Sequence, residues 1–150
     1  MKKFDEKSKK YVSIGVVVLM LVALVLIFVL ANSASKDFKP KGKLSAKLED
    51  SSIKSNESTF LLVGVKNDGK ELLEAKIQVT PDDSEAIKIT YDAPELLNVM
   101  LLPGESVVRR LEVQGLSKAI RTDYELNTEL IGKNETTLAK QKIILIVKKD

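Results

Sequence analysis

The pattern of apolar and polar residues along this chain changes near Lys43. Before it, residues 12–31 (VSIGVVVLMLVALVLIFVLA) form an apolar stretch of twenty residues without a charge. A helix rises 1.5 Å per residue and the core of a bilayer is about 30 Å thick, so this stretch is long enough to cross a membrane once. From Lys43 onward apolar residues alternate with polar ones, a period of two that is typical of β-strands. The pattern therefore predicts one transmembrane α-helix followed by an all-β domain.

These two patterns divide the chain into four parts. Residues 1–11 form a polar, lysine-rich tail, and residues 12–31 form the predicted transmembrane helix. Residues 32–42 (NSASKDFKPKG) have no apolar period and contain a proline and a glycine, which is typical of a linker. Residues 43–150 form the predicted β domain. We expect a single-pass protein of the cell membrane, with a cytoplasmic N-terminus and an extracytoplasmic C-terminal domain.

The orientation of the predicted span depends on more than its flanking charges. Lysines lie on both sides of the apolar stretch, so the positive-inside comparison is nearly balanced. Two triplets, Asn56-Glu57-Ser58 and Asn134-Glu135-Thr136, match the acceptor pattern for N-glycosylation, and both fall in predicted turns. Asn56 and Asn134 are therefore glycosylation candidates, and they favour a domain outside the cell.

Two other interpretations of the N-terminal segment stay open. Small residues at 31–35 would suit a signal peptidase, although the apolar region of a signal peptide has about 7–15 residues and this one is longer. A pilin-type leader would be cut just before the apolar helix, but Lys10-Tyr11-Val12 lacks the small residue usual after the last basic residue. A pilin-like or archaellum-stator-type component of a surface filament or motor is the alternative function.

Short alternating segments separated by turn signals predict seven or eight strands. At 8 to 12 residue spacing, such strands indicate an antiparallel, immunoglobulin-like β-sandwich. Residues 93–102 (APELLNVMLL) fit either a short helical turn or a strand that crosses between sheets. The other predicted strands cover residues 44–48, 59–66, 72–80, 87–91, 106–113, 124–130 and 138–147.

Turn residues predict how these strands connect. Asn67-Asp68-Gly69 predicts a hairpin in which Gly69 has positive φ. Residues 102–105 (LPGE) predict a tight turn, and residues 132–134 (GKN) predict the final hairpin. Tyr124 follows a long connection and precedes an inward leucine by two residues, which is where an immunoglobulin-type sandwich has its tyrosine corner; an ordinary strand aromatic is the other interpretation.

Composition excludes most kinds of catalytic site. The sequence has no Cys and no His, which removes thiolate nucleophiles, imidazole bases and the usual zinc sites. The first eleven residues carry five Lys, one Asp and one Glu, which accounts for the whole net charge of +3. The basicity therefore belongs to the tail and indicates no nucleic-acid surface. We expect a protein that is not an enzyme and that uses no cofactor, small-molecule substrate or nucleic acid.

An acidic run after the third long strand is the candidate for a metal. Asp82-Asp83-Ser84-Glu85 offers several oxygen ligands of the kind that Ca²⁺ prefers. Its spacing matches no calcium loop, so we interpret the run as a solvated turn and expect no metal site.

A resemblance to a known family rests on turn chemistry and alternation. Residues 60–79 (FLLVGVKNDGKELLEAKIQV) and residues 101–106 (LLPGES), with the strand at 107–113, resemble the CARDB-like immunoglobulin-type domains of archaeal and bacterial surface proteins. The resemblance covers roughly residues 43–149. It implies a structural, adhesive or spacing module on a cell surface, archaeal in character, and it carries over no catalytic residues.

The last strand supplies the candidate interface. Residues 143–147 (IILIV) are apolar on both faces of a strand, so either the strand is covered on both faces within the domain or Ile144 and Ile146 contact another protein. Arg109 alternates with apolar residues of its own strand, so its guanidinium must leave the core face, either to an ion pair or to a rim position. We expect a non-catalytic module that packs against another surface or membrane protein, with Ile144, Ile146 and Arg109 as interface candidates.

Overall fold

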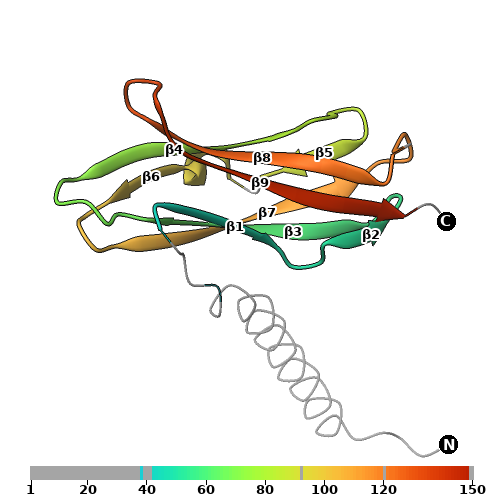
Figure 1. Ribbon diagram of the computed structural model, residues 1–150, viewed down its shortest axis with the longest axis horizontal. Helices are drawn as coiled ribbons and strands as arrows, with labels where there is room; N and C mark the ends of the chain where they lie inside the picture. Colours follow the sequence, from blue (N-terminus) through green and yellow to red (C-terminus); the bar gives the residue numbers. More distant parts are fainter. Residues whose placement is uncertain (1–37, 39–41, 92, 120, 149–150) are drawn as a thin grey trace, which may run out of the picture. The chain divides into compact units, whose positions relative to one another are not determined.

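The computed structural model describes Phe38 and residues 42–91, 93–119 and 121–148. In these residues nine strands form two facing sheets (Figure 1). The predicted tail, span and most of the linker lie outside the described residues. Within the described part, no helix is both long and apolar enough to cross a membrane. The elements are β1 (Leu44–Leu48), β2 (Ser52–Lys54), β3 (Ser58–Lys66), β4 (Leu73–Pro81), β5 (Ile87–Thr90), the 3₁₀ helix η1 (Pro94–Leu97), β6 (Asn98–Leu101), β7 (Ser106–Gly115), β8 (Asp123–Gly132) and β9 (Thr137–Lys148).

The nine strands exceed the predicted seven or eight because the sequence pattern does not predict β2; β6 falls in the stretch 93–102, for which a strand is one of the two interpretations. The four-stranded sheet has the order β1-β3-β7-β5, and the five-stranded sheet has the order β2-β9-β8-β4-β6. All pairings are antiparallel except that of β2, which runs parallel to β9. The prediction of a purely antiparallel sandwich is wrong at this one strand, whose three residues are too few to carry a sequence signal.

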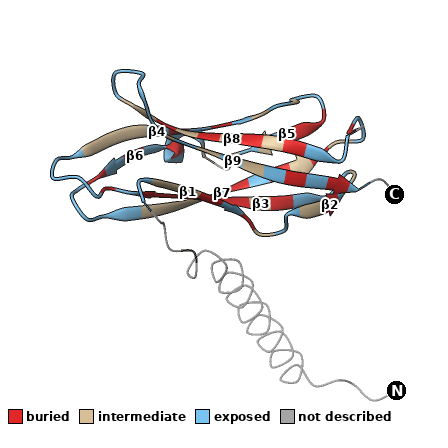
Figure 2. Ribbon diagram, viewed as in Figure 1, coloured by how far each residue is buried: buried red, intermediate tan, exposed pale blue. Residues whose placement is uncertain are grey.

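The core lies between the two sheets, and the predicted alternation determines it (Figure 2). In β3, Leu61, Val63 and Val65 are completely buried, as the period of two predicts. In β4, Ile77 and Val79 are buried whereas Lys76 and Gln78 are exposed. With no cysteine in the chain, this apolar layer takes the place of the disulfide found in many small extracellular domains.

The predicted hairpin at Asn67-Asp68-Gly69 is wrong. The strands before and after it, β3 and β4, belong to different sheets, and Gly69 does not have positive φ. The buried Asn67 side chain holds this crossover instead. Its Nδ2 donates hydrogen bonds to the carbonyl oxygens of Glu71 at 2.7 Å and Leu101 at 2.9 Å, and its Oδ1 accepts one from the Gly69 N–H at 3.0 Å.

The stretch 93–102 combines both of its predicted interpretations. After β5 the chain leaves the four-stranded sheet, forms η1, and continues as β6 at the edge of the five-stranded sheet. The predicted tight turn follows and is confirmed, because the Glu105 N–H bonds to the Leu102 carbonyl at 3.0 Å and Gly104 has φ 83°.

Two ends of the sandwich can be told apart by their hydrogen bonds. At the proximal end, where the chain enters β1, lie the connection after β3, the turn before β7 and the β8–β9 hairpin. At the distal end, the Asn56 N–H bonds to the Gly115 carbonyl at 2.7 Å and the Ser55 N–H bonds to the Lys148 carbonyl at 3.1 Å. The distal end therefore gathers the β2–β3 turn and the last residues of β7 and β9.

Candidate functional site

The last strand places two isoleucines on the outer face of the five-stranded sheet. In β9, Leu145 and Val147 point into the core, while Ile144 is 46% exposed and Ile146 is 37% exposed (Figure 2). Side chains at i and i+2 of a strand lie on one face, so Ile144 and Ile146 form one apolar patch, here called the Ile144–Ile146 patch. The described domain therefore covers the inner face of residues 143–147 and leaves the outer face open.

Polar residues surround the Ile144–Ile146 patch on the neighbouring strands. Glu125 of β8 lies opposite Ile144, and Asp123 of β8 and Ser52 of β2 lie on either side of Ile146. Lys142 Nζ lies 2.7 Å from Glu125 Oε2. That hydrogen bond, with the attraction of the carboxylate, raises the pKa of Lys142. The patch is therefore a small apolar centre with a charged rim, the usual anatomy of a protein–protein contact.

β9 is held on three sides, so it presents this patch on a rigid surface. It lies between β2 and β8 in the sheet. On its inner face, Gln141 forms two hydrogen bonds to the backbone of Ala46: its Oε1 accepts from the N–H at 2.8 Å, and its Nε2 donates to the carbonyl at 3.1 Å. Gln141 therefore joins β9 to β1 of the opposite sheet. Gln141 alternates with Ile143, Leu145 and Val147, so the sequence pattern could have identified it as a partly buried polar residue on the inner face.

Arg109 lies apart from the other two interface candidates. It belongs to β7 in the four-stranded sheet, and its Nε donates a 2.6 Å hydrogen bond to the carbonyl of Leu96 in η1. The guanidinium thus leaves the core face, as its parity predicts, but its partner is a main-chain oxygen rather than a carboxylate. The structure brings Ile144 and Ile146 together and places Arg109 elsewhere.

The surroundings of Arg109 form an open edge of the sandwich. β5 pairs with β7 only from Glu112 to Gly115, so residues 106–111 of β7 have no strand beside them on that side in the described chain. A hollow of about 380 Å³ follows this edge. It is lined by Val99, Met100, Leu101, Glu105, Ser106, Val107 and Arg109. A charged side chain at such an edge, here Arg109, hinders the addition of a further strand.

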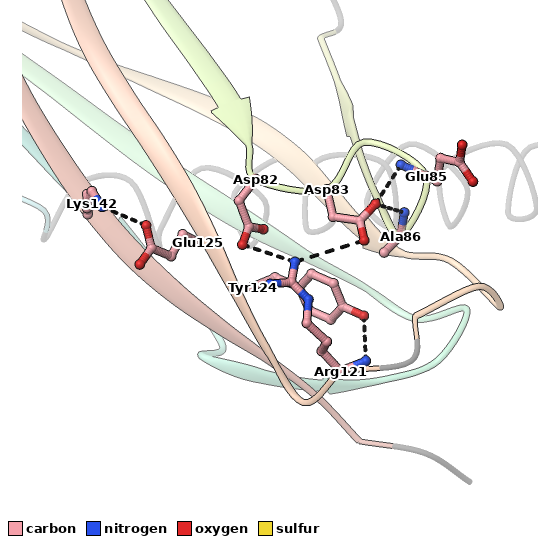
Figure 3. A network of polar contacts seen from close by, with 8 residues as sticks. All are labelled: Asp82, Asp83, Glu85, Ala86, Arg121, Tyr124, Glu125 and Lys142. Atoms are coloured by element: carbon pink, nitrogen blue, oxygen red, sulfur yellow. Dashed lines mark hydrogen bonds and ion pairs between the residues drawn. The ribbon is translucent and has the colours of Figure 1, made fainter.

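The acidic run at 82–85 binds an arginine of its own chain. Arg121 Nη2 lies 3.0 Å from an Asp82 carboxylate oxygen and 3.9 Å from one of Asp83, and its guanidinium lies 4.8 Å from the centre of the Tyr124 ring (Figure 3). The hydrogen bond to Asp82 raises the pKa of Arg121 further above its ordinary value. Asp83 also accepts hydrogen bonds from the backbone N–H groups of Glu85 and Ala86.

These contacts describe a capped turn rather than a cation site. The carboxylates that a calcium ion would need already face a guanidinium and two backbone donors. Among the described residues, no group of three acidic, His or Cys side chains is placed to hold a metal.

A hollow of about 640 Å³ lies outside β4 and β6, next to the β8–β9 hairpin. Lys133 and Glu74 form an ion pair of 3.0 Å at its wall, and Met100, which is 68% exposed, contributes apolar surface. Its lining residues include the carboxylates of Glu74 and Glu135 and no Ser, Thr or Tyr.

The two glycosylation candidates lie at opposite ends of the sandwich, and both side chains are exposed. Asn56 lies in the β2–β3 turn at the distal end, with φ 63°. Asn134 lies at the tip of the β8–β9 hairpin at the proximal end.

Comparison with known proteins shows the fold. No protein-family model matches this sequence. No curated protein sequence matches it either. The CARDB domain of a Pyrococcus furiosus protein, solved in complex with di-metal ions, is similar over 71% of this chain and 86% of its own, with 16% identity and a TM-score of 0.53.

Two further solved structures support the same assignment. A FixG-related protein from Vibrio parahaemolyticus is similar over 70% of this chain and 94% of its own, with 14% identity and a TM-score of 0.53. Escherichia coli α2-macroglobulin is similar over 73% of this chain and 7% of its own, with 17% identity and a TM-score of 0.56. The described domain is an immunoglobulin-like β-sandwich, as predicted; at these identities the likeness concerns the fold alone.

Proposed function

We propose that this protein is a single-pass membrane protein whose immunoglobulin-like sandwich lies outside the cell and binds another surface or membrane protein through the Ile144–Ile146 patch. The sandwich acts without catalysis. The observation that carries the proposal is the exposure of two adjacent isoleucines on a rigid sheet face with a charged rim. The predicted span at residues 12–31 supports the membrane anchor.

The patch lies away from the point where the chain enters the sandwich. The chain enters at the proximal end, at β1. β9 runs from the proximal hairpin toward the distal end, and Ile144 and Ile146 lie in its distal half.

Free energies indicate how large the contact must be. Full burial of an isoleucine side chain is worth about 1.5–3 kcal/mol, and these two are already more than half buried, so covering the patch adds roughly 1 kcal/mol for each. A stable interface covers about 800 Å² on each partner. The contact must therefore extend over neighbouring residues such as Ser52, Asp123 and Glu125, which would give the binding its selectivity.

Crosslinking in intact membranes, followed by mass spectrometry of the linked chains, tests the proposal. Replacing Ile144 and Ile146 together by Thr should reduce recovery of the partner at least about fivefold, equivalent to roughly 1 kcal/mol, while the thermal transition of the purified chain stays the same. Leu138→Thr is the matched control, because Leu138 is 36% exposed on the same strand, at its other end. Unchanged recovery from the double variant, or unfolding of the sandwich, contradicts the proposed interface.

Processing of the N-terminus separates the proposal from the filament alternative. A signal-anchored protein keeps its first residues, whereas a pilin-like protein loses the tail before the apolar helix. The mass of the chain extracted from membranes distinguishes the two.

A further inference from the structure

We propose that Asn134, and not Asn56, is the residue of this chain that carries an N-linked glycan. This inference rests on the proposed function to the extent that the sandwich must lie outside the cytoplasm. Both residues belong to Asn-x-Ser/Thr triplets, so the sequence alone treats them as equivalent. The structure separates them by three observations.

The first observation concerns the backbone of each triplet. The Asn56 N–H bonds to the Gly115 carbonyl at 2.7 Å, the Gly115 N–H bonds to the Glu57 carbonyl at 3.1 Å, and Ser58 pairs with Gln114 in the sheet. All three residues of this triplet are therefore fixed to the end of β7. A transferase would have to separate the β2–β3 turn from β7 before it could bind the triplet.

The second triplet has no such attachment. The backbone bonds at the hairpin tip run from the Gly132 N–H to the Thr136 carbonyl at 2.9 Å and from the Glu135 N–H to the Gly132 carbonyl at 3.0 Å. Both bonds stay within the tip. Opening the tip therefore breaks these two bonds at the end of β8 and the exposed Lys133–Glu74 ion pair, but leaves the pairing of β3 with β7 intact. Local openings cost least where few contacts are broken.

The third observation concerns why asparagine stands at each position. Asn56 has φ 63°, a left-handed conformation that asparagine tolerates better than most residues, so the turn itself accounts for its identity. At the hairpin tip the residue with positive φ is Glu135, at 57°, and not Asn134. Neither Asn134 nor Thr136 makes a side-chain hydrogen bond in the described part of the chain, and both side chains are exposed. Backbone conformation therefore accounts for an asparagine at 56 but not at 134.

The modification is a group transfer from a lipid-linked oligosaccharide. Asn134 Nδ2 forms a bond to the anomeric carbon of the first sugar. The bond from that carbon to the lipid phosphate oxygen breaks, and the phosphate leaves with the electron pair. The amide proton passes to a carboxylate of the transferase. The products are the glycosylated chain and the free lipid phosphate.

A glycan at this position is compatible with the proposed interface. Lys133 and Glu135, its sequence neighbours, line the hollow outside β4 and β6, so the glycan would cover that part of the sheet. Ile144 lies seven positions after Thr137 along β9, or about 23 Å at 3.3 Å per residue, so the Ile144–Ile146 patch stays accessible.

Mass spectrometry of the full-length chain, extracted from membranes of the cells that produce it, tests the inference. Trypsin places the two sites on separate peptides, residues 55–66 and residues 134–140, the latter extended to 122–140 if the glycan blocks cleavage after Lys133. We expect the glycan on the second peptide and an unmodified first peptide. Asn134→Gln and Thr136→Ala should each remove the glycan, whereas Asn56→Gln should leave the mass of the glycan unchanged.

A topology control keeps this result separate from the proposed function. The chain has no cysteine, so a Ser117→Cys variant reports its own accessibility to a membrane-impermeant maleimide on intact cells. Ser117 is exposed in the loop between β7 and β8. If Cys at 117 is labelled and Asn134 is unmodified, or if Asn56 carries the glycan, the inference is overturned while the location outside the cell stands. If Cys at 117 is protected, the proposed location fails and the inference fails with it.

Discussion

The hydroxyl of the completely buried Tyr124 accepts a 3.0 Å hydrogen bond from the backbone N–H of Arg121, three residues earlier in the chain. This is the arrangement of a tyrosine corner, the first of the two interpretations of Tyr124. The Arg121 side chain lies over the ring of the same tyrosine and reaches Asp82 (Figure 3). Tyr124 therefore fixes the loop that leads from β7 in one sheet to β8 in the other.

Tyr124→Phe should remove this hydrogen bond and little else. The Arg121 N–H would lose its partner, and leaving a partly buried donor unpaired costs about 1–2 kcal/mol. We expect that decrease in the free energy of unfolding, measured by denaturant unfolding of the detergent-solubilised full chain. Tyr91→Phe is the control, because Tyr91 is half-buried at the end of β5, and it should change the free energy by less than about 0.5 kcal/mol. Equal effects from both substitutions would argue against the corner.

Asn67→Ala should destabilise the sandwich more strongly. The substitution leaves the carbonyls of Glu71 and Leu101 without their amide donor and the Gly69 N–H without its acceptor. Buried groups left without partners cost about 1–3 kcal/mol each, and the loop can relax partly, so we expect a loss of about 2–4 kcal/mol. Asn127→Ala, at a partly exposed position of β8, should have an effect within about 0.5 kcal/mol. Thermal unfolding followed by circular dichroism makes the comparison.

Arg109→Val should make the protein associate with itself. The substitution removes the positive charge of Arg109 from the open edge of β7, and edges without such a charge pair more readily with other strands. We expect oligomers that increase with protein concentration in sedimentation velocity experiments in detergent. Arg110→Val applies the same change to the opposite face of the same strand, where Arg110 pairs with Glu49 at 3.0 Å, and should leave the protein unassociated. If Arg109→Val stays monomeric at every concentration, Arg109 is not what prevents this edge from pairing with another strand.

Tyr91 should make the protein less stable in alkali. Burial raises the pKa of Tyr91 above its ordinary value of about 10, because the charged phenolate is poorly solvated there. A folded-state pKa above the unfolded one favours folding below pH 10, and this contribution is lost as the pH rises through the folded-state pKa.

The phenolate absorbance of the native chain minus that of Tyr91→Phe should therefore rise with its midpoint above pH 10. The free energy of unfolding should fall less in Tyr91→Phe than in the native chain as the pH rises above 10. Lys142, whose pKa is also raised, is present in both chains and cancels in this comparison. A midpoint at or below pH 10 would contradict the prediction.

Sequence reasoning recovers the features that depend on neighbouring residues. The alternation in β3, β4 and β9 predicts which side chains enter the core, because successive residues of a strand face opposite sides. It fails where the outcome depends on residues far along the chain. Asn67-Asp68-Gly69 has the composition of a hairpin, yet Asn67 bonds to Leu101 and directs the chain into the other sheet.

At the candidate site too, the sequence predicts local features but not those that depend on distant residues. Residues 143–147 are apolar on both faces, so the sequence allows either cover on both faces or one open face, and only the arrangement of the two sheets shows that Ile144 and Ile146 are exposed. The alternation along β7 predicts that the Arg109 side chain must leave the core face. It does not predict the hydrogen-bond partner, because Leu96 belongs to a 3₁₀ helix in a stretch that fits either a helical turn or a strand.

The position of β9 inside its sheet affects how the domain can be synthesised. The ribosome makes this strand after the other eight, yet β2 and β8 pair with it on either side and Gln141 ties it to β1. The five-stranded sheet therefore cannot close before the residues up to 148 have been synthesised. A chain that stops before β9 lacks the strand between β2 and β8 and never gains a complete core.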